Sequence, residues 1–401
     1  MMKRPTILFY CQHSLGMGHL VRSFALADRL AERFRVMLLN GGRLPAGMIV
    51  PPQVELINLP PLGIDEANQL VSHDKRIPVE RALDRRQKMI RVTFDNLQPA
   101  VVLVELFPFG RKKFAGELLP LLQAARNEAT RALVVCSLRD ILVGRKTHQQ
   151  QHDDHAAAVA NEFFDVVLVH SDPGFARFEE SFRPSIPFNV PVRYTGFVVP
   201  RAAAALRLKT RQKRIVVSAG GGLVGEPLLR LAINAQRYLE EDPKIEMKVI
   251  AGPFMPEESW QSLQSLALER KRLRLVRQVS DLCIELSSAA VSISQAGYNT
   301  CLDVLRAGVP ALLVPFANNH EDEQRKRALR LQQLGAVKVL EEKDSTPEGL
   351  AAQIRSLIDA KFVRPDLDLN GAETSTQLIE SMLESRTHSI ADFSGETSYA
   401  N

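Results

Sequence analysis

A histidine at the start of a predicted helix is the first residue of this sequence that is placed to do chemistry. His19 follows a glycine-bearing turn, GMG at residues 16–18, between a buried strand over 6–11 and an amphipathic helix over 19–32. Such a turn lies at the carboxyl edge of a parallel sheet, where ligands bind. There the imidazole can deprotonate a hydroxyl, and the helix N-terminus disfavours its cationic form. The competing interpretation is that this lone histidine only begins a helix.

Two further glycine turns follow buried strands and are expected to bind phosphate. Residues 218–225 read SAGGGLVG after a strand over 215–218, and three successive glycines leave backbone amides free for an anion. Gly297 turns a strand over 290–293 into a helix over 298–306. A helix N-terminus at the end of a strand suits a diphosphate. Asn299 and Thr300 occupy positions that favour capping of this helix.

Polar side chains follow the second turn. Asp303 lies one helical turn further on and can accept hydrogen bonds from a ribose diol, although a lone aspartate on a helix is ordinarily only solvated. Glu323 and Gln324 begin the next helix, predicted over 321–333, and can reach sugar hydroxyls. The combination with the glycine turn favours a nucleotide-sugar site over a solvated helix face.

The first half of the chain delivers further polar residues to strand ends. Glu105 ends a strand over 101–106 and is an alternative base, and Arg111 follows it as a phosphate contact for an acceptor. Arg139 follows the next strand, over 132–137, where it can bind an acceptor or simply pair with Asp140. His13, in the loop before His19, is a weaker candidate on the acceptor side. Consecutive strands therefore place their polar ends at one edge of a sheet.

The elements that position these residues alternate between strand and helix in both halves of the chain. This order predicts an α/β protein with two doubly wound, Rossmann-like domains that face each other across a cleft. We expect an N-terminal acceptor-side domain over 1–199, a C-terminal nucleotide-sugar domain over 200–384 and a loose tail over 385–401. The hinge is predicted within 196–214, and residues 374–383 are expected to pack back on the first domain.

Composition excludes several other classes of protein. The net charge of +5 permits an anionic substrate or membrane surface and does not indicate nucleic acid. Four scattered cysteines in apolar runs indicate reduced core thiols, and no apolar run approaches the ~20 residues that span a bilayer. We therefore expect a cytoplasmic protein, in peripheral contact with a membrane at most.

Cofactor and metal patterns are incomplete. The 16–18 turn lacks the third glycine of a dinucleotide fingerprint, because Val21 stands there, so NAD binding is not expected. His148, His152 and His155 have the spacing of metal ligands but lie in a very polar helix, and the Asp366-Leu367-Asp368 string lies late, near a proline. No metal and no cofactor are therefore predicted.

The stretch SQAGYNTCLDVLRAGVPALLVPF, followed by EDEQRKRA, resembles the nucleotide-sugar motif of GT-B glycosyltransferases. Within that fold the nearest resemblance is to the family of N-acetylglucosaminyltransferases that complete the lipid-linked peptidoglycan precursor, with a glycosyltransferase family 28 type C-terminal domain. The resemblance implies inverting, metal-independent transfer from a nucleoside-diphosphate sugar, preferably a UDP-sugar, to an alcohol on a lipid-linked or polysaccharide acceptor. It implies His19 as the base. It also implies donor contacts at Ser218, Gly220, Gly221, Gly222, Phe254, Val279, Ser294, Gly297, Asp303 and Gln324. Together with these, the predicted donor site contains Gly16, Gly18, Asn299, Thr300 and Glu323.

Two departures from the family pattern concern the donor, and other activities stay open. Asp303 stands where glutamate is usual, and Glu323 stands where a second glutamine is frequent, which leaves the donor sugar open. The string GMGHLVR, which includes Arg22, also resembles nucleotide-sugar hydrolases of pseudaminic acid synthesis, which share this fold and activate water. A non-hydrolysing epimerase or a non-catalytic nucleotide-sugar-binding protein would use the same nucleotide site.

Overall fold

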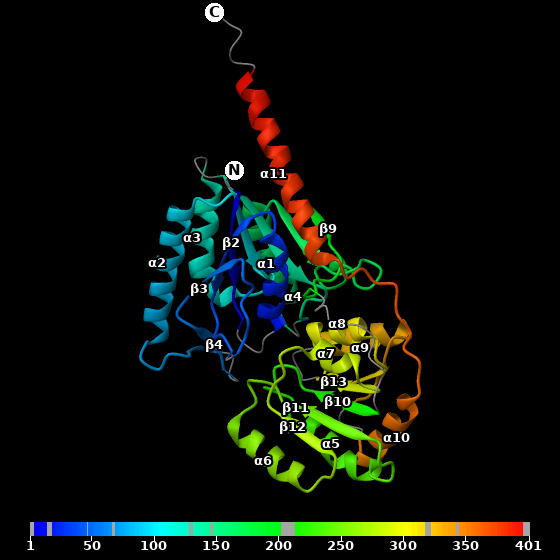
Figure 1. Ribbon diagram of the computed structural model, residues 1–401. Helices are drawn as coiled ribbons and strands as arrows, with labels where there is room; N and C mark the ends of the chain where they lie inside the picture. The colour runs from blue at the N-terminus through cyan, green and yellow to red at the C-terminus, as the bar shows by residue number, and fades with distance from the viewer. Residues whose placement is uncertain are drawn as a thin grey trace, which may run out of the picture.

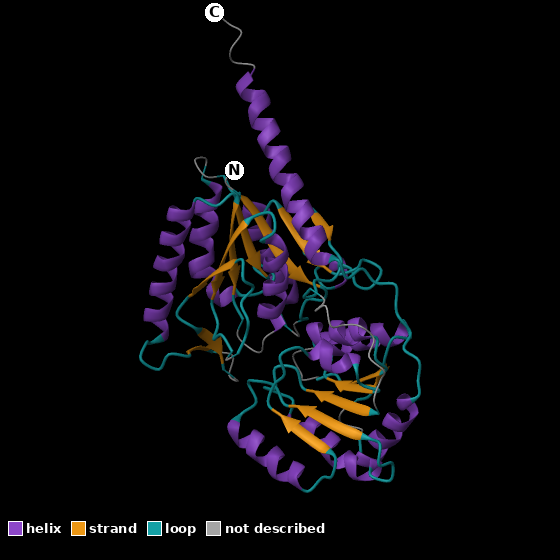
Figure 2. Cartoon of the chain, in the orientation of Figure 1, coloured by secondary structure: helices purple, strands orange, loops and turns teal. Residues whose placement is uncertain are grey.

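The computed structural model describes residues 4–13, 18–45, 47–65, 69–127, 131–144, 147–201, 213–316, 322–341 and 345–395, with side chains up to residue 386. The chain forms two α/β domains, each with one main sheet between layers of helices (Figures 1 and 2). The domain boundary expected at 199/200 adjoins residues 202–212, which lie outside the described residues.

The first domain is built on a seven-stranded sheet in the order β3-β2-β1-β6-β7-β8-β9, and every pairing in it is parallel. The strand order reverses between β1 and β6, which makes this pair the topological switch point where a crevice opens. The strands are β1 (Thr6–Cys11), β2 (Arg35–Asn40), β3 (Val54–Asn58), β6 (Val101–Glu105), β7 (Leu133–Arg139), β8 (Val166–His170) and β9 (Val192–Tyr194). The helices are α1 (Gly18–Leu30), α2 (Val79–Leu97), α3 (Ala115–Arg126) and α4 (Gln149–Phe163), and a small hairpin pairs β4 (Leu62–Ile64) with β5 (Leu70–Ser72).

The second domain repeats this plan with six parallel strands in the order β12-β11-β10-β13-β14-β15. Its switch point lies between β10 and β13. The strands are β10 (Arg214–Ser218), β11 (Glu246–Ile250), β12 (Leu273–Val276), β13 (Val291–Ser294), β14 (Ala311–Leu313) and β15 (Lys338–Val339). The helices are α5 (Glu226–Ala235), α6 (Glu257–Leu268), α7 (Leu282–Ser287), α8 (Tyr298–Ala307), α9 (Glu323–Gln333) and α10 (Pro347–Ile358).

The alternation of side chains along the strands divides each core into two layers. In β1, Ile7 and Phe9 pack in the layer that contains α1, whereas Leu8 and Tyr10 pack in the layer of α2, α3 and α4. Both faces of the strand are therefore covered, which is why its residues are continuously apolar. One layer of the second domain also contains Ile141 and Phe175 of the first domain, so apolar packing joins the two domains.

The end of the chain returns to the first domain. Phe197 N–H donates to the carbonyl of Asp368 at 2.7 Å, and Gly371 N–H donates to the carbonyl of Phe197 at 3.0 Å. Helix α11 (Gly371–Gly395) then lies along α1, with Ile379 fully buried in the core layer of α1 (Figure 1). The expected return of 374–383 to the first domain is confirmed, so the part of α11 up to residue 384, assigned to the second domain by sequence, packs on the first.

One expectation about secondary structure differs from the structure. The loose tail expected from residue 385 is helical up to Gly395, because no proline or glycine between Ala372 and Ser394 interrupts the helix. After β8 the chain makes a turn, in which the Asp172 carboxylate accepts a hydrogen bond from Gly174 N–H at 2.7 Å.

Candidate active site

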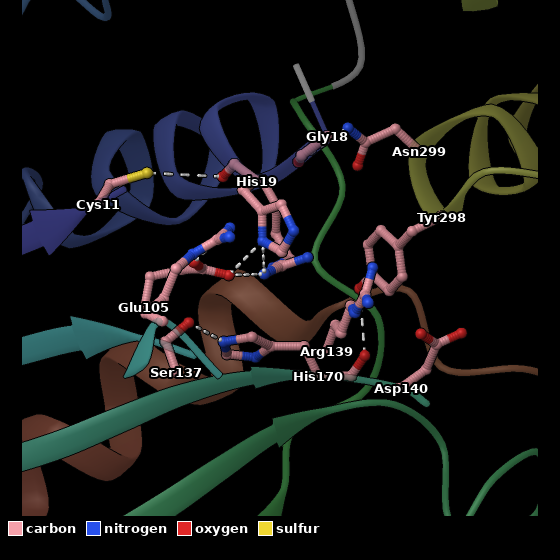
Figure 3. A network of polar contacts seen from close by, with 12 residues as sticks. Cys11, Gly18, His19, Glu105, Ser137, Arg139, Asp140, His170, Tyr298 and Asn299 are labelled. Atoms are coloured by element: carbon pink, nitrogen blue, oxygen red, sulfur yellow. Dashed lines mark hydrogen bonds and ion pairs between the residues drawn. The ribbon is translucent and has the colours of Figure 1, made fainter. Parts of the chain in front are cut away.

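His19 and Glu105 form a hydrogen-bonded pair at the switch point of the first sheet. His19 is the second residue of α1, and Glu105 ends β6, the strand beside β1. The distance between His19 Nδ1 and Glu105 Oε1 is 2.6 Å, and Figure 3 shows the two side chains pointing toward one another. Glu105 is fully buried, and 15% of the His19 side chain is exposed. Glu105, an alternative base by sequence, is thus the partner of the predicted base.

Two arginines compensate the buried charge of Glu105. Arg22, one helical turn after His19, donates from Nη2 to Glu105 Oε1 and is 2% exposed. Arg111 Nη2 lies 3.7 Å from Glu105 Oε2. Burial raises the pKa of Glu105, but the hydrogen bond from His19 and the charges of Arg22 and Arg111 outweigh it, so the pKa of Glu105 lies below its usual range. Glu105 is therefore an anion.

Burial keeps His19 neutral. It lowers the pKa of His19 to about 3, more than the Glu105 carboxylate raises it, and Arg111 and Arg139 lower it further. From the sequence we expected the helix N-terminus to keep the His19 imidazole neutral, whereas in the structure burial is the leading cause. A neutral imidazole that donates its Nδ1–H to Glu105 has Nε2 as its basic nitrogen. This arrangement can accept a proton from a hydroxyl and stabilise the resulting cation.

His13 lies at the edge of the same site, but it is fixed by a different contact. Its Nε2 lies 3.2 Å from Asn40 Oδ1, and burial lowers the pKa of His13 to about 4. The neighbouring Gln12 accepts a hydrogen bond from the fully buried Arg86 at 2.7 Å. Arg86 also donates to the carbonyl of Gly41, so these strand-end loops are rigidly connected.

Arg139 and Asp140 pair with the second domain and not with each other. Arg139 Nη1 donates to Glu323 Oε1 at 3.0 Å, and Asp140 accepts two hydrogen bonds from Arg327, at 2.7 and 2.8 Å. Glu323 and Arg327 are one turn apart on α9, so two neighbouring acid–base pairs connect the domains. The predicted acceptor-side residue Arg139 and the predicted donor-side residue Glu323 are thus brought together.

The two glycine turns of the second domain lie side by side at its switch point. Ser218 and Ser294 end the adjacent strands β10 and β13 and are paired in register. Ser218 Oγ accepts a hydrogen bond from Gly220 N–H at 3.3 Å. Gly222 has a φ of +91°, and a Cβ on it would lie 2.4 Å from the carbonyl oxygen of Ala251, so only glycine fits. The carbonyl of Gly221, between Gly220 and Gly222, accepts a hydrogen bond from the backbone N–H of Phe254 at 3.0 Å.

Helix α8 begins at this position without a side-chain cap. Gly297 is its N-cap residue and Thr300 is buried, but neither Asn299 nor Thr300 caps the helix, contrary to the sequence-based expectation. Asn299 instead donates from Nδ2 to the carbonyl of Gly18 at 3.1 Å, across the domain interface. The helix N-terminus can therefore receive an anion, and it lies beside the first turn of α1 (Figure 3).

The remaining donor candidates lie around α8 and α9. Arg306 Nη1 lies 3.4 Å from Asp303 Oδ1. Burial, together with the charge of Asp281, raises the pKa of Asp303 to about 7. Val279, in the loop after β12, packs partly buried against the core layer of α8. Gln324 Oε1 accepts a hydrogen bond from Phe316 N–H at 3.2 Å and so supports the loop after β14. Gly16 lies outside the described residues.

The histidine-rich helix contributes to packing. His152 Nδ1 lies 3.2 Å from Asp153 Oδ1, and Asp154 accepts hydrogen bonds from Ser185. Within the described ranges, no group of three or more His, Cys, Asp or Glu residues is arranged to hold a metal ion.

Sequence reasoning missed Tyr298 and His170, which lie between the two halves of the site. His170 ends β8 and is fully buried, with Nε2 2.7 Å from Ser137 Oγ and Nδ1 2.9 Å from Thr195 Oγ1. The carbonyl of His170 accepts a hydrogen bond from the Tyr298 hydroxyl at 3.1 Å. The available signal was that Tyr298 is an aromatic residue directly after the glycine turn at Gly297.

Comparison with known proteins gives the same fold and a partial family match. Residues 215–366 match the glycosyltransferase family 28 C-terminal domain. Over 161 residues the chain is 26% identical to the UDP-N-acetylglucosamine–N-acetylmuramyl-(pentapeptide) pyrophosphoryl-undecaprenol N-acetylglucosamine transferase of Desulfitobacterium hafniense, covering 40% of this chain and 43% of that protein. The chain thus spans less than half the length of the first curated relatives it matches.

Solved structures extend the likeness to the whole chain. The crystal structure of Acinetobacter baumannii MurG superimposes with a TM-score of 0.56 at 19% identity, over 94% of this chain and 100% of that one. A putative UDP-N-acetylglucosamine 2-epimerase from Listeria monocytogenes gives a TM-score of 0.57 at 12% identity, over 96% of this chain and 97% of that one. The predicted GT-B fold and the resemblance to GT-B glycosyltransferases are confirmed.

Proposed function

We propose that this protein is a glycosyltransferase that moves a sugar from a UDP-sugar to an alcohol acceptor with inversion at the anomeric carbon. One observation carries the proposal: the His19–Glu105 pair lies beside the uncapped N-terminus of α8, and Asn299 connects the two through Gly18. A base and a diphosphate-binding turn are thus parts of one site.

The chemistry follows from the roles of these groups. The acceptor hydroxyl gives its proton to His19 Nε2, and its oxygen attacks the anomeric carbon opposite the diphosphate. The bond from that carbon to the diphosphate oxygen breaks, and its electron pair leaves with the diphosphate. Glu105 stabilises the imidazolium, and the backbone amides of the glycine turns with the α8 N-terminus stabilise the leaving group. No metal or other cofactor takes part in this proposal.

The identity of the substrates is supported by the relatives. Their names specify UDP-N-acetylglucosamine as donor and an undecaprenol-linked acceptor, so we propose an N-acetylhexosamine or hexose donor and a lipid-linked or polysaccharide acceptor. We place the protein in the cytoplasm, in peripheral contact with the inner face of the membrane. Among the helices that the structure describes, none is long and apolar enough to cross a membrane.

The proposal is tested by binding followed by turnover. Calorimetric titration with UDP, GDP, dTDP and their common sugars is expected to show the tightest binding for a UDP-sugar. Incubation of that UDP-sugar without an acceptor should release little free sugar. Rapid release of free sugar would identify a hydrolase, and failure of every nucleotide to bind would contradict a nucleotide-sugar site.

Replacement of Asp303 by asparagine is expected to remove a pH dependence of donor binding. The pKa of Asp303 is raised to about 7, and a ribose diol donates a stronger hydrogen bond to the carboxylate than to the carboxylic acid. The wild-type affinity for a UDP-sugar should therefore rise about tenfold from about pH 6 to about pH 8, as Asp303 ionises. The esterified diphosphate keeps a constant charge over this range.

The comparison of variants makes this prediction specific. Asp303→Asn should bind more weakly than the wild type at the higher pH and show a flat profile, whereas Asp303→Glu should keep the rise. An unchanged pH dependence in Asp303→Asn would remove Asp303 from the donor site.

A further inference from the structure

Tyr298 is the first residue of α8, directly after the glycine turn, and it contacts three parts of the first domain and its linker. Its hydroxyl donates to the carbonyl of His170 and accepts a hydrogen bond from Val198 N–H, both at 3.1 Å. The guanidinium carbon of Arg22 lies 5.2 Å from the centre of its ring. Tyr298 is 6% exposed, so these contacts are made in a buried environment. Figure 3 shows the Tyr298 side chain pointing toward His170.

Arg22 contacts both residues of the His19–Glu105 pair and the Tyr298 ring. Its Nη2 donates to Glu105 and lies 3.5 Å from His19 Nδ1, and Tyr298 covers the guanidinium from the second domain. A cation over an aromatic face is attracted to it, and the attraction is larger when both groups are desolvated. The ring therefore holds Arg22 in the orientation that neutralises Glu105.

A second arginine also contacts the ring. The guanidinium carbon of Arg327 lies 5.8 Å from the ring centre, and Arg327 donates to the carbonyl of Ala296, next to the Gly297 turn, at 2.9 Å. Arg327 is held in turn by the buried Asp140 of the first domain. Tyr298 thus contacts both Arg22, which pairs with Glu105, and Arg327, which donates to the carbonyl next to the Gly297 turn.

We propose that Tyr298 is a positioning residue that orients the His19–Glu105 pair through Arg22 when the two domains are closed. The aromatic ring is the part that acts on Arg22, while the hydroxyl attaches α8 to the end of β8 and to the interdomain linker. The expected effect of Tyr298 on kcat rests on the proposed function. Its expected effect on the hydrogen bond between His19 and Glu105 does not, because this bond can be measured without any turnover.

Two variants distinguish the role of the Tyr298 ring from the role of its hydroxyl. Tyr298→Phe keeps the ring over Arg22 and loses only the hydroxyl contacts, whereas Tyr298→Leu removes the ring and lets Arg22 and water rearrange around Glu105. We expect kcat to fall about tenfold in Tyr298→Leu, with the KM for the UDP-sugar changed less than about twofold, and Tyr298→Phe to recover most of kcat.

The decisive readout is the NMR signal of the His19 Nδ1 proton in protein with labelled histidine, assigned by its disappearance in His19→Gln. A short hydrogen bond to a carboxylate protects this proton and shifts it downfield. We expect the signal in the wild type and in Tyr298→Phe, and its broadening or loss in Tyr298→Leu. Tyr298→Met, another non-aromatic variant, replaces Tyr298→Leu should that variant fail to fold.

Two failures are distinguishable. An equally sharp Nδ1 proton signal in Tyr298→Leu or Tyr298→Met and in the wild type would overturn the positioning role, even if the protein transfers sugar. A wild type that consumes no nucleotide sugar would defeat the proposed function, and the NMR comparison would still decide whether Tyr298 orients the pair.

Discussion

His19→Gln is expected to lower kcat by about 10²–10⁴-fold, the range that a positioned general base contributes. Glutamine keeps a polar side chain of similar reach but cannot accept the acceptor's proton. The affinity for a UDP-sugar should change little, because the two glycine turns proposed to hold the diphosphate, after β10 and β13, belong to the second domain. The measurement is steady-state kinetics beside calorimetric titration of the same UDP-sugar.

His155→Gln is the matched control, since His155 is exposed on α4 and remote from the proposed chemistry. It should behave as the wild type. Because the pKa of His19 is lowered to about 3, the wild-type kcat should not fall as the pH is lowered from about 8 to about 5 through protonation of this residue. Unchanged turnover in His19→Gln would show that another group takes the proton.

Asp140→Asn is expected to open the domain interface. Asp140 is fully buried, accepts two hydrogen bonds from Arg327, and has a pKa below its usual range because Arg327 outweighs the effect of burial. Removal of one partner from a buried ion pair costs about 3–5 kcal/mol, because the other charge stays buried and unpaired. Separation of the two domains would expose Arg327 to water and so avoid this cost. We therefore expect a larger fraction of molecules with separated domains in Asp140→Asn.

Small-angle scattering and thermal melting measure this effect. The radius of gyration should increase in Asp140→Asn without a nucleotide, and the melting temperature should fall. Asp74→Asn is the control: it removes an exposed ion pair with Arg76, which is 89% exposed, and should change neither quantity. The double variant Asp140→Leu with Arg327→Met removes both charges and should recover most of the stability. A closed, fully stable Asp140→Asn protein would contradict the role of this pair.

Sequence reasoning located the residues at strand ends well, because a buried parallel strand and a glycine turn have local signatures. The strand Thr6–Cys11 has the bounds that the pattern predicted. His19 and Glu105 were each placed at the edge of the first sheet. Their direct contact depends on β1 and β6 being neighbours, and strand order is set by packing over the whole domain.

Contacts between the domains could not be predicted in this way. Arg139 and Asp140 are adjacent in sequence and opposite in charge, so the sequence offered only acceptor binding by Arg139 or a pair between the two residues. In the structure their partners are on α9, 184 and 187 residues away. Tyr298 reads in sequence as an ordinary residue at a helix start, and its contacts with Arg22 and with the carbonyl of His170 exist only because the two sheets face each other.

The most direct test of the account follows the anomeric proton by NMR in a mixture of the protein, UDP-N-acetylglucosamine and a lipid-linked alcohol acceptor. The account predicts a new glycoside of inverted anomeric configuration, formed in step with UDP release and abolished in His19→Gln. Release of free N-acetylglucosamine at the same rate without the acceptor, or a product of retained configuration, would contradict it.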